Sequence, residues 1–294
     1  MSKKITALLL AVLMVLSIAA FAGCSKSDNE KDTSAPANQS EQTSEDEKEP
    51  SSEANLPEDF TLIVGLDASF PPYGYTDDNG EIVGFDIDLA KEVAKRNGWE
   101  FKAVPIDWDS KDAELNSGNI NCIWNGFTIN GRENDYTWTK PYVDNSQVLV
   151  VMADSGIKTL ADLEGKTVIT QAGSSAESTI KDEENEDMVK FLASLKELTT
   201  NPDYNGAFME LQSGAADAVA MDVGVAKYQI ESRGADKFVI LDEVLAAEQY
   251  GVGFRLGDTA ACNAVQKTLD EMKADGTLNK IAEEWDLVDA LVKE

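Results

Sequence analysis

The stretch LIVGLDASFPPY, Leu62–Tyr73, is an apolar run that leads into an acid, an aromatic residue and two prolines. It predicts a buried strand followed by a stiff loop. The next stretch, Phe85–Asn97, repeats apolar residues at helical spacing and stops before Gly98, where glycine favours a left-handed cap. Because Trp99–Val104 then reads as a strand again, we expect a parallel sheet covered by helices.

The same alternation of strands and helices continues along the chain. A short helix is expected near Asp112–Ser117, and a strand at Asn121–Trp124. A capping box at Thr159–Asp162 opens a second α/β unit. Within that unit and after it we expect strands at Thr167–Thr170, Ala218–Met221, Phe238–Leu241 and Tyr250–Phe254, and helices at Ser175–Lys181, Asn205–Ser213, Val223–Ser232 and Thr259–Asp275.

Composition excludes several classes of function. The formal net charge is −29, which repels nucleic acid and anionic lipid, so no nucleic-acid partner is expected. Histidine is absent, which removes the usual general base and the commonest metal ligand. Cys122 and Cys262 lack metal-ligand spacing and are expected to be buried, and the sequence leaves open whether they pair. We therefore expect no metal, no cofactor and no enzymatic activity.

A binding pattern lies in NGFTINGR, Asn125–Arg132, just beyond an apolar segment. The guanidinium of Arg132 offers a planar fork of donors that matches a carboxylate, and Thr128 adds a neutral hydroxyl. The pattern predicts a carboxylate site, although an isolated arginine is more often simply exposed at a surface.

Together these segments resemble the extracytoplasmic solute-binding proteins of polar amino-acid ABC importers, bacterial solute-binding protein family 3. The resemblance runs from about Leu56 to the C-terminus. The motifs that carry it are Leu62–Tyr73, Ile82–Leu89, Asn125–Arg132, Gly165–Val168, Gly173–Ser175 and Asp217–Asp222. It implies an α/β, two-lobed fold like that of the periplasmic binding proteins. Two parallel-rich sheets with flanking helices would be joined by a two-strand hinge near Tyr142–Gln147 and Ala246–Tyr250.

The resemblance also divides the chain. Residues 56–144 would form the first part of lobe 1, residues 145–249 lobe 2, and residues 250–294 the return to lobe 1. Residues 1–23 fit a signal peptide, with a basic start and an apolar run, and Phe21–Cys24 resembles a lipoprotein box. Cys24 would then carry lipid, and the acidic, polar residues to position 55 would form a disordered tether.

The resemblance assigns roles to residues of the site. Arg132 would bind the ligand carboxylate, helped by Thr128 and by free backbone N–H groups at Gly173–Ser174, and Asp222 would pair with the ligand ammonium. Gly126 would add a carbonyl to the same ammonium. The full predicted set is Asp67, Phe70, Trp108, Asn125, Gly126, Thr128, Arg132, Gln171, Ser174 and Asp222.

The side-chain end of the site would be aromatic and acidic. Phe70 and Trp108 would enclose the ligand side chain, with core packing as the alternative. Asp67 would favour a cationic or amide side chain, or would instead cap the turn that follows it. Asn125 would narrow the pocket or reach the side chain. The spacing from Thr128 to Arg132 is one residue shorter than is common in the family, and Gly131 permits the tighter turn that Arg132 then needs.

The implied function is high-affinity binding of a polar L-amino acid, with a basic or amide side chain favoured and cystine as a further candidate. Lobe closure would deliver this ligand from a lipid-anchored monomer to an ABC permease and its ATPase. The location would be the outer face of the cell membrane, with a Gram-positive surface favoured. Alternatives are a cyclohexadienyl or arogenate dehydratase on the same fold and a sensory ligand-binding module. The sequence alone does not identify the ligand.

Overall fold

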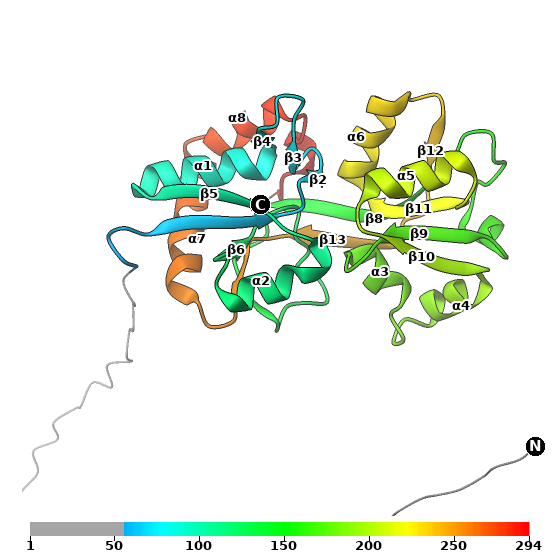
Figure 1. The fold of residues 1–294 in the computed structure, drawn as a ribbon, viewed down its shortest axis with the longest axis horizontal. Helices are drawn as coiled ribbons and strands as arrows, with labels where there is room; N and C mark the ends of the chain where they lie inside the picture. Colours follow the sequence, from blue (N-terminus) through cyan, green and yellow to red (C-terminus); the bar gives the residue numbers. More distant parts are fainter. Residues whose placement is uncertain (1–55, 294) are drawn as a thin grey trace, which may run out of the picture. The chain divides into compact units, whose positions relative to one another are not determined.

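Residues 56–293 are described by a computed structural model, which contains two main sheets and one small sheet. The expected signal peptide, Cys24 and the tether lie outside the described residues, as does Glu294. Helices cover both faces of each main sheet, which is an α/β architecture (Figure 1). Within residues 56–293, no helix has the length and apolar character needed to cross a membrane.

The first main sheet joins parallel and antiparallel pairs. Its strands, in spatial order, are β5 (Glu100–Pro105), β1 (Thr61–Leu66), β6 (Cys122–Ile123), β14 (Gly253–Arg255) and β7 (Tyr136–Trp138). Strands β5, β1 and β6 are parallel, whereas β14 is antiparallel to both neighbours. Helix α1 (Phe85–Asn97) packs on one face and α2 (Lys111–Ser117) on the other, because alternate apolar residues of β1 point to opposite sides (Figure 1).

The second main sheet is also mixed. Its strands are β10 (Glu197–Asn201), β9 (Thr167–Gln171), β11 (Ala218–Asp222), β8 (Val143–Met152) and β12 (Phe238–Ile240), with β13 (Ala246–Tyr250) also paired to β8. Strands β10, β9 and β11 are parallel, and β8 is antiparallel to all its partners. The helices around it are α3 (Ser175–Ile180), α4 (Glu186–Ser194), α5 (Tyr204–Ser213) and α6 (Val223–Arg233). Two of the four strand pairs in the first sheet and two of the five in the second are parallel, so the sheets are mixed and not parallel-rich as expected.

Strands β8 and β13 connect the two sheets. They pair with each other from Val143 opposite Tyr250 to Gln147 opposite Ala246, and both run between the two halves of the described structure (Figure 1). We call the first sheet and its helices lobe 1, the second sheet and its helices lobe 2, and the pair β8–β13 the hinge. The residue limits given above for the lobes stay a prediction.

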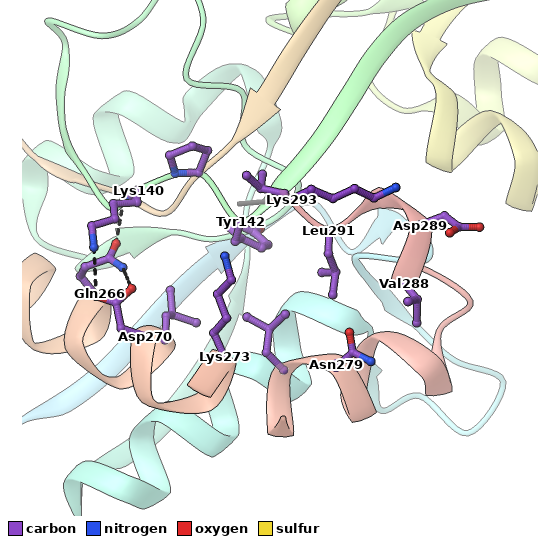
Figure 2. Close-up of a pocket in the computed structure, with 14 residues that line it drawn as sticks. Lys140, Tyr142, Gln266, Asp270, Lys273, Asn279, Val288, Asp289, Leu291 and Lys293 are labelled. Carbon is purple, nitrogen blue, oxygen red and sulfur yellow. Dashed lines mark hydrogen bonds and ion pairs between the residues drawn. The ribbon is translucent and has the colours of Figure 1, made fainter. Parts of the chain in front are cut away.

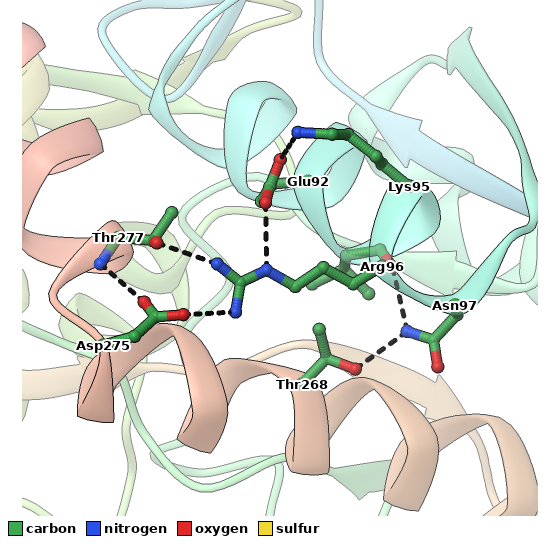
Figure 3. Close-up of polar contacts among 8 residues, drawn as sticks. Glu92, Lys95, Arg96, Asn97, Thr268, Asp275 and Thr277 are labelled. Atoms are coloured by element: carbon green, nitrogen blue, oxygen red, sulfur yellow. Dashed lines mark hydrogen bonds and ion pairs between the residues drawn. The ribbon is translucent and has the colours of Figure 1, made fainter.

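The last helices pack on lobe 1. Helix α7 (Thr259–Ala274) and helix α8 (Thr277–Glu284) lie against α1. Arg96 of α1 donates to Asp275 at 2.7 Å and to Thr277 at 2.8 Å, and Asn97 donates to Thr268 at 2.8 Å (Figure 3). These bonds tie the end of the chain to a segment almost 180 residues earlier.

Local signals in the sequence placed most of these elements. Gly98 and Gly118 adopt left-handed conformations where α1 and α2 end, and the capping box at Thr159 opens the 3₁₀ turn η2 (Leu160–Leu163). The single strand expected at Tyr250–Phe254 is wrong. Instead β13 ends at Tyr250 and β14 begins at Gly253, because the two strands belong to different sheets.

Several short elements were not expected. They are the small sheet of β2 (Ser69–Phe70), β3 (Gly74–Thr76) and β4 (Ile82–Val83), the strands β7 and β10, the helices α4 and α8, and the 3₁₀ turns η1 (Trp108–Ser110) and η3 (Val288–Ala290). The largest buried cluster runs from lobe 1 through the hinge into lobe 2, and includes Phe85, Tyr142 and Phe208. Cys122 and Cys262 are buried free thiols.

Candidate functional site

A small cavity lies between the lobes and collects most of the predicted residues. Its lining is Phe70, Trp108, Gly126, Thr128, Arg132, Gln171, Ser174, Ser175 and Asp222. The cavity is nearly closed, because the volume accessible to the centre of a water-sized sphere is only about 10 Å³. Eight of the ten predicted residues line this cavity, and Asp67 and Asn125 do not. The lobes are therefore close together, and an amino acid would need them to separate before it enters.

Arg132 stands at one end of the cavity, half-buried. The backbone N–H of Arg132 donates to the carbonyl of Ile129 at 2.9 Å, and Gly131 has a φ of 77°, so the tight turn forms. The guanidinium donates to the carbonyl of Thr128 at 3.3 Å and to that of Gly173 in lobe 2 at 3.4 Å. No carboxylate pairs with it among the described residues. The shorter spacing thus leaves Arg132 facing the cavity and free to bind an anion.

Asp222 also lines the cavity, at the position where β11 ends. Its Oδ1 accepts hydrogen bonds from Tyr250 at 2.6 Å, Gln147 at 2.7 Å and Asn145 at 2.8 Å. The bonds to Asp222 within the described residues all end on Oδ1, so Oδ2 is left for another donor. Burial, and then the charge of Glu248, raise the pKa of Asp222 to about 7.

Glu248 was missed by the sequence reasoning. Its Oε1 accepts hydrogen bonds from Thr128 at 2.8 Å, Asn145 at 2.7 Å and Gln147 at 2.7 Å, and its Oε2 accepts one from Ser175 at 2.5 Å. The Thr128 hydroxyl therefore gives its proton to Glu248, and not to a ligand carboxylate as expected. The available signal was the period of two in β13, which places Glu248 on the same face as buried Tyr250.

Gly126 is held between the aromatic side chains of the cavity. Its φ is 56°, and a Cβ there would come within 2.8 Å of the Phe70 ring. Its N–H donates to Asp86 Oδ2 at 2.6 Å, and Tyr142 donates to Asp86 Oδ1 at 2.7 Å. Burial raises the pKa of Asp86 to about 7. The lack of a side chain at Gly126 is thus required by packing and backbone conformation, whatever the ligand needs.

The aromatic walls come from lobe 1. Phe70 lies 6.0 Å from Tyr204 of lobe 2 between ring centroids, and Trp108 packs edge-on against Phe127 at 5.6 Å. The Nζ of Lys111 lies 5.4 Å from the Trp108 ring and donates to the carbonyl of Gly173 at 3.2 Å. Burial, with the charge of Arg132 second, lowers the pKa of Lys111. Lys111 is therefore a second cation of the cleft that the sequence reasoning did not name.

Asp67 and Gln171 meet across the cleft. Gln171 of lobe 2 donates to Asp67 Oδ2 at 2.7 Å, while Asp67 Oδ1 accepts from the N–H of Ser69 at 2.8 Å. Asp67 therefore caps the turn that follows it, which is the alternative role expected from the sequence, and it also links the two lobes. Its pKa is raised to about 6, chiefly by burial. Asn125 accepts from the N–H of Asp67 at 2.9 Å and lies behind the cavity wall.

The backbone donors expected at Gly173–Ser174 are occupied. The N–H of Gly173 donates to Glu177 at 2.8 Å, and the N–H of Ser174 to the carbonyl of Gln171 at 3.3 Å. The Ser174 hydroxyl caps α3 by accepting from the N–H of Glu177 at 3.1 Å. The prediction of free N–H groups there is wrong for this conformation, because Glu177 folds back over the turn.

A larger cavity of about 480 Å³ lies in lobe 1, and Tyr142 is one of the residues that line it (Figure 2). It shares none of its lining residues with the cleft cavity, and three lysines, Lys140, Lys273 and Lys293, stand around its apolar floor. Lys140 is paired with Asp270 at 3.1 Å. No cluster of three or more potential metal ligands occurs within residues 56–293. Unlike this cavity, the cleft cavity joins both lobes and carries charges of both signs.

Known proteins are similar over most of the chain. The family model for bacterial extracellular solute-binding proteins, family 3, matches residues 62–288. The L-cystine-binding protein TcyJ of Escherichia coli strain K12 is 31% identical over 228 residues, 76% of this chain and 82% of that protein. ABC transporter arginine-binding protein 1 of the same strain is 30% identical over 230 residues, 76% of this chain and 90% of that protein.

A solved structure is similar as well. The crystal structure of an ABC uptake transporter substrate-binding protein from Streptococcus pneumoniae with bound histidine has a TM-score of 0.75 and 33% identity. The match covers 79% of this chain and 95% of that chain. This likeness confirms the fold class expected from the sequence.

Proposed function

The chain belongs to the bacterial extracellular solute-binding proteins, family 3, and on that premise we propose that it binds one polar L-amino acid and delivers it to an ABC permease. The observation that carries the proposal is the cleft cavity, because both Arg132 and Asp222 line this one space between the lobes. A zwitterion needs such a pair of opposite charges. Arg132 binds the carboxylate in bidentate fashion, and Asp222 Oδ2 accepts from the ammonium.

The side chain of the ligand extends toward Phe70 and Trp108, whose rings favour an apolar or cationic stem. Beyond them Asp67 and Gln171 offer an acid and an amide. This wall favours a basic or amide side chain, and the relatives that bind arginine, histidine or cystine make these amino acids the first to test. Ligand binding replaces the contacts that Arg132 and Gln171 make across the cleft, and the closed state then docks on the permease with its ATPase.

A thermal shift assay tests the proposal directly. The purified protein is unfolded and refolded to remove bound ligand, and then heated with each common amino acid and with cystine. At a hundredfold excess over the dissociation constant, the expected stabilisation is about 2.7 kcal/mol. A shift with one polar amino acid supports the proposal and identifies the ligand. The absence of any shift would overturn it.

The cellular setting is proposed on the sequence alone. Cys24 carries lipid, residues 25–55 form the tether, and the protein works as a monomer at the outer face of the membrane, with a Gram-positive surface favoured. Mass spectrometry of the mature protein tests this, because Cys24→Ser should abolish the lipid adduct.

An enzyme on this fold is the second candidate. Lys111 and Glu248 are two ionisable cleft residues that a dehydratase would use as acid and base, and both are buried beside the cavity. We favour binding without chemistry because the relatives compared above are binding proteins. Turnover of arogenate or prephenate by the purified protein would reverse that preference.

A further inference from the structure

The end of the cleft that holds Asp222 contains a second carboxylate, Glu248 of β13. Glu248 accepts the hydroxyl protons of Thr128 in lobe 1 and Ser175 in lobe 2. Its own strand belongs to the hinge. A single carboxylate thus contacts both lobes and the hinge at the point where the ligand ammonium is proposed to bind.

Asp222 and Glu248 are bridged by the same two amides. Asn145 Nδ2 lies 2.8 Å from Asp222 Oδ1 and 2.7 Å from Glu248 Oε1, and Gln147 Nε2 lies 2.7 Å from each. The two carboxylate oxygens are therefore no more than two hydrogen-bond lengths apart. The side-chain oxygens of Asn145 and Gln147 have no partner among the described residues, although both side chains are more than nine-tenths buried. The region is thus rich in acceptors.

No cation balances these two carboxylates within residues 56–293. Neither forms an ion pair with a lysine or arginine. The other ionisable groups that face them are Tyr73, Tyr204 and Tyr250, whose pKa values burial raises well above the usual range, so they stay neutral. Arg132 lines the same cavity and, with Glu248, a second cavity between the lobes, but its guanidinium donates to the carbonyls of Thr128 and Gly173 and forms no ion pair with either carboxylate. Two carboxylates this close and this buried are costly to ionise together.

We propose that Glu248 completes the ammonium site, and that Asp222 and Glu248 together hold one proton, which the α-ammonium of the ligand displaces. This rests on the proposed function, because it assumes that an amino acid places its ammonium at Asp222. The charges balance: the pair changes from one negative charge to two, the ammonium brings one positive charge, and one proton leaves to solvent. Binding then becomes tighter as the pH rises, by up to tenfold per pH unit below the raised pKa of Asp222.

Glu248 is also a positioning residue for Thr128. A hydroxyl has a single proton, and this one is given to Glu248, so the Thr128 oxygen keeps only lone pairs for the cavity. Thr128 then accepts from the ammonium beside Asp222. The ammonium is surrounded by acceptors that are already fixed before it arrives.

Titration calorimetry measures directly how many protons are released when the ligand binds. Binding of L-arginine and of L-cystine is measured at pH 6 in two buffers with different ionisation enthalpies, and the difference gives the protons released. We expect about one proton at pH 6 and close to none at pH 8.5, where the pair has lost its proton. For an arginine binder, the analogue 5-guanidinopentanoic acid, which lacks the α-ammonium, should release none. Equal release at both pH values would overturn the proposal.

Two matched variants test whether the proton release depends on Glu248. Glu248→Gln removes one charge of the pair and keeps the side-chain shape, so we expect proton release at pH 6 to fall by at least half and the pH dependence to move to lower pH. Glu231→Gln removes a carboxylate that is exposed on α6, and should behave as the wild type. Wild-type proton release in Glu248→Gln would contradict the role of Glu248.

A titration without ligand separates this inference from the proposed function. Carboxyl carbons of the labelled full-length protein are followed by NMR between pH 4 and 9, with assignments from Asp222→Asn and Glu248→Gln. We expect the Asp222 carboxyl to titrate near pH 7 in the wild type and at lower pH in Glu248→Gln. If both titrate below pH 5, the proton is absent and the inference is wrong. If neither amino acid binds but the pair titrates as expected, the proton site stands and the proposed ligands fail.

Discussion

The two ends of the cleft cavity are built differently. At the anion end, Arg132 is half-buried, and its guanidinium reaches two carbonyls at 3.3 and 3.4 Å. At the cation end, Asp222 and Glu248 are buried and accept seven hydrogen bonds of 2.5 to 2.8 Å. The cation end is thus formed before a ligand arrives, whereas at the anion end Arg132 lies 5.3 Å from the centroid of the Phe127 ring and makes longer hydrogen bonds that a ligand carboxylate can replace.

This difference indicates how one scaffold can accept different amino acids. A fixed acceptor set suits the ammonium, which has the same geometry in every common amino acid except proline. The arginine fork can adjust to small changes in the position of the carboxylate as the side chain changes. Discrimination is then left to the walls around Phe70, Trp108 and Asp67.

The largest effect should come from Arg132→Ala. It removes the only arginine that lines the cavity, and loss of one partner of a desolvated charge pair costs about 2–5 kcal/mol, so binding should fall below detection or weaken at least thirtyfold. Calorimetry with the ligand found by thermal shift measures it. Arg96→Ala, which removes an arginine on α1, is the control with unchanged affinity. Near-normal affinity of Arg132→Ala would show that the carboxylate binds elsewhere.

The next effect concerns pH and stability without ligand. Asp86 and Asp222 have pKa values raised to about 7, and Asp67 to about 6, all chiefly by burial. The folded protein therefore holds protons that the unfolded chain has already lost between pH 4 and 7, and stability should fall as the pH rises through that window. We expect a loss of about 2 kcal/mol or more from pH 5 to 8 in urea unfolding.

Carboxylates with lowered pKa values, such as Glu92 beside Lys95 and Arg96, lose their contribution only below about pH 4 and so do not mask this trend. Asp86→Asn should reduce the slope of stability against pH. A stability that rises steadily from pH 5 to 8 would show that these carboxyls are ionised throughout, and would also weaken the contrast between the two ends of the cavity.

A smaller effect is expected at the side-chain wall. Asp67→Asn removes the negative charge and keeps one acceptor oxygen, for the N–H of Ser69, while its side-chain NH2 can donate to Gln171 once the Gln171 amide turns over. Affinity for arginine should fall about tenfold, roughly 1.4 kcal/mol, while affinity for glutamine should change little. Competition binding with both amino acids measures the ratio, with the exposed Asp236→Asn as control. If the ratio of the two affinities does not change, Asp67 only caps its turn and links lobe 1 to Gln171, and it does not select the ligand.

The smallest effect is expected far from the cleft. Arg96→Ala breaks the contacts of α1 with Glu92, Asp275 and Thr277, all on the surface of lobe 1 (Figure 3). Exposed ion pairs contribute little, so unfolding should become easier by about 1 kcal/mol or less. Affinity for the amino acid should be unchanged. A clear loss of affinity would show that the α1–α7 contact affects the cleft.

Sequence reasoning succeeded where the signal was local or chemical. Helix α1 and its cap at Gly98 were predicted from the helical spacing of apolar residues and from one glycine. Arg132 and Asp222 were predicted from their chemistry, because an arginine and an aspartate have few roles in a cleft other than binding opposite charges. Sequence reasoning failed for residues whose burial depends on partners that are distant in the chain. Strand β13, AAEQY, reads as an exposed polar segment, and Glu248 becomes buried only because β8, Thr128 and Ser175 surround it.

The pairing of β8 with β13 limits the motion of the lobes. Two separate connections would let the lobes shift and twist independently, but these two are hydrogen-bonded over five residue pairs and bend as one ribbon. This pairing favours one hinge rotation of lobe 2 against lobe 1. Approach of Gln171 to Asp67 and approach of Arg132 to Gly173 become the same movement. A fluorophore pair across the cleft should accordingly show exchange between two distances with a single relaxation time, set by the stiffness of that ribbon.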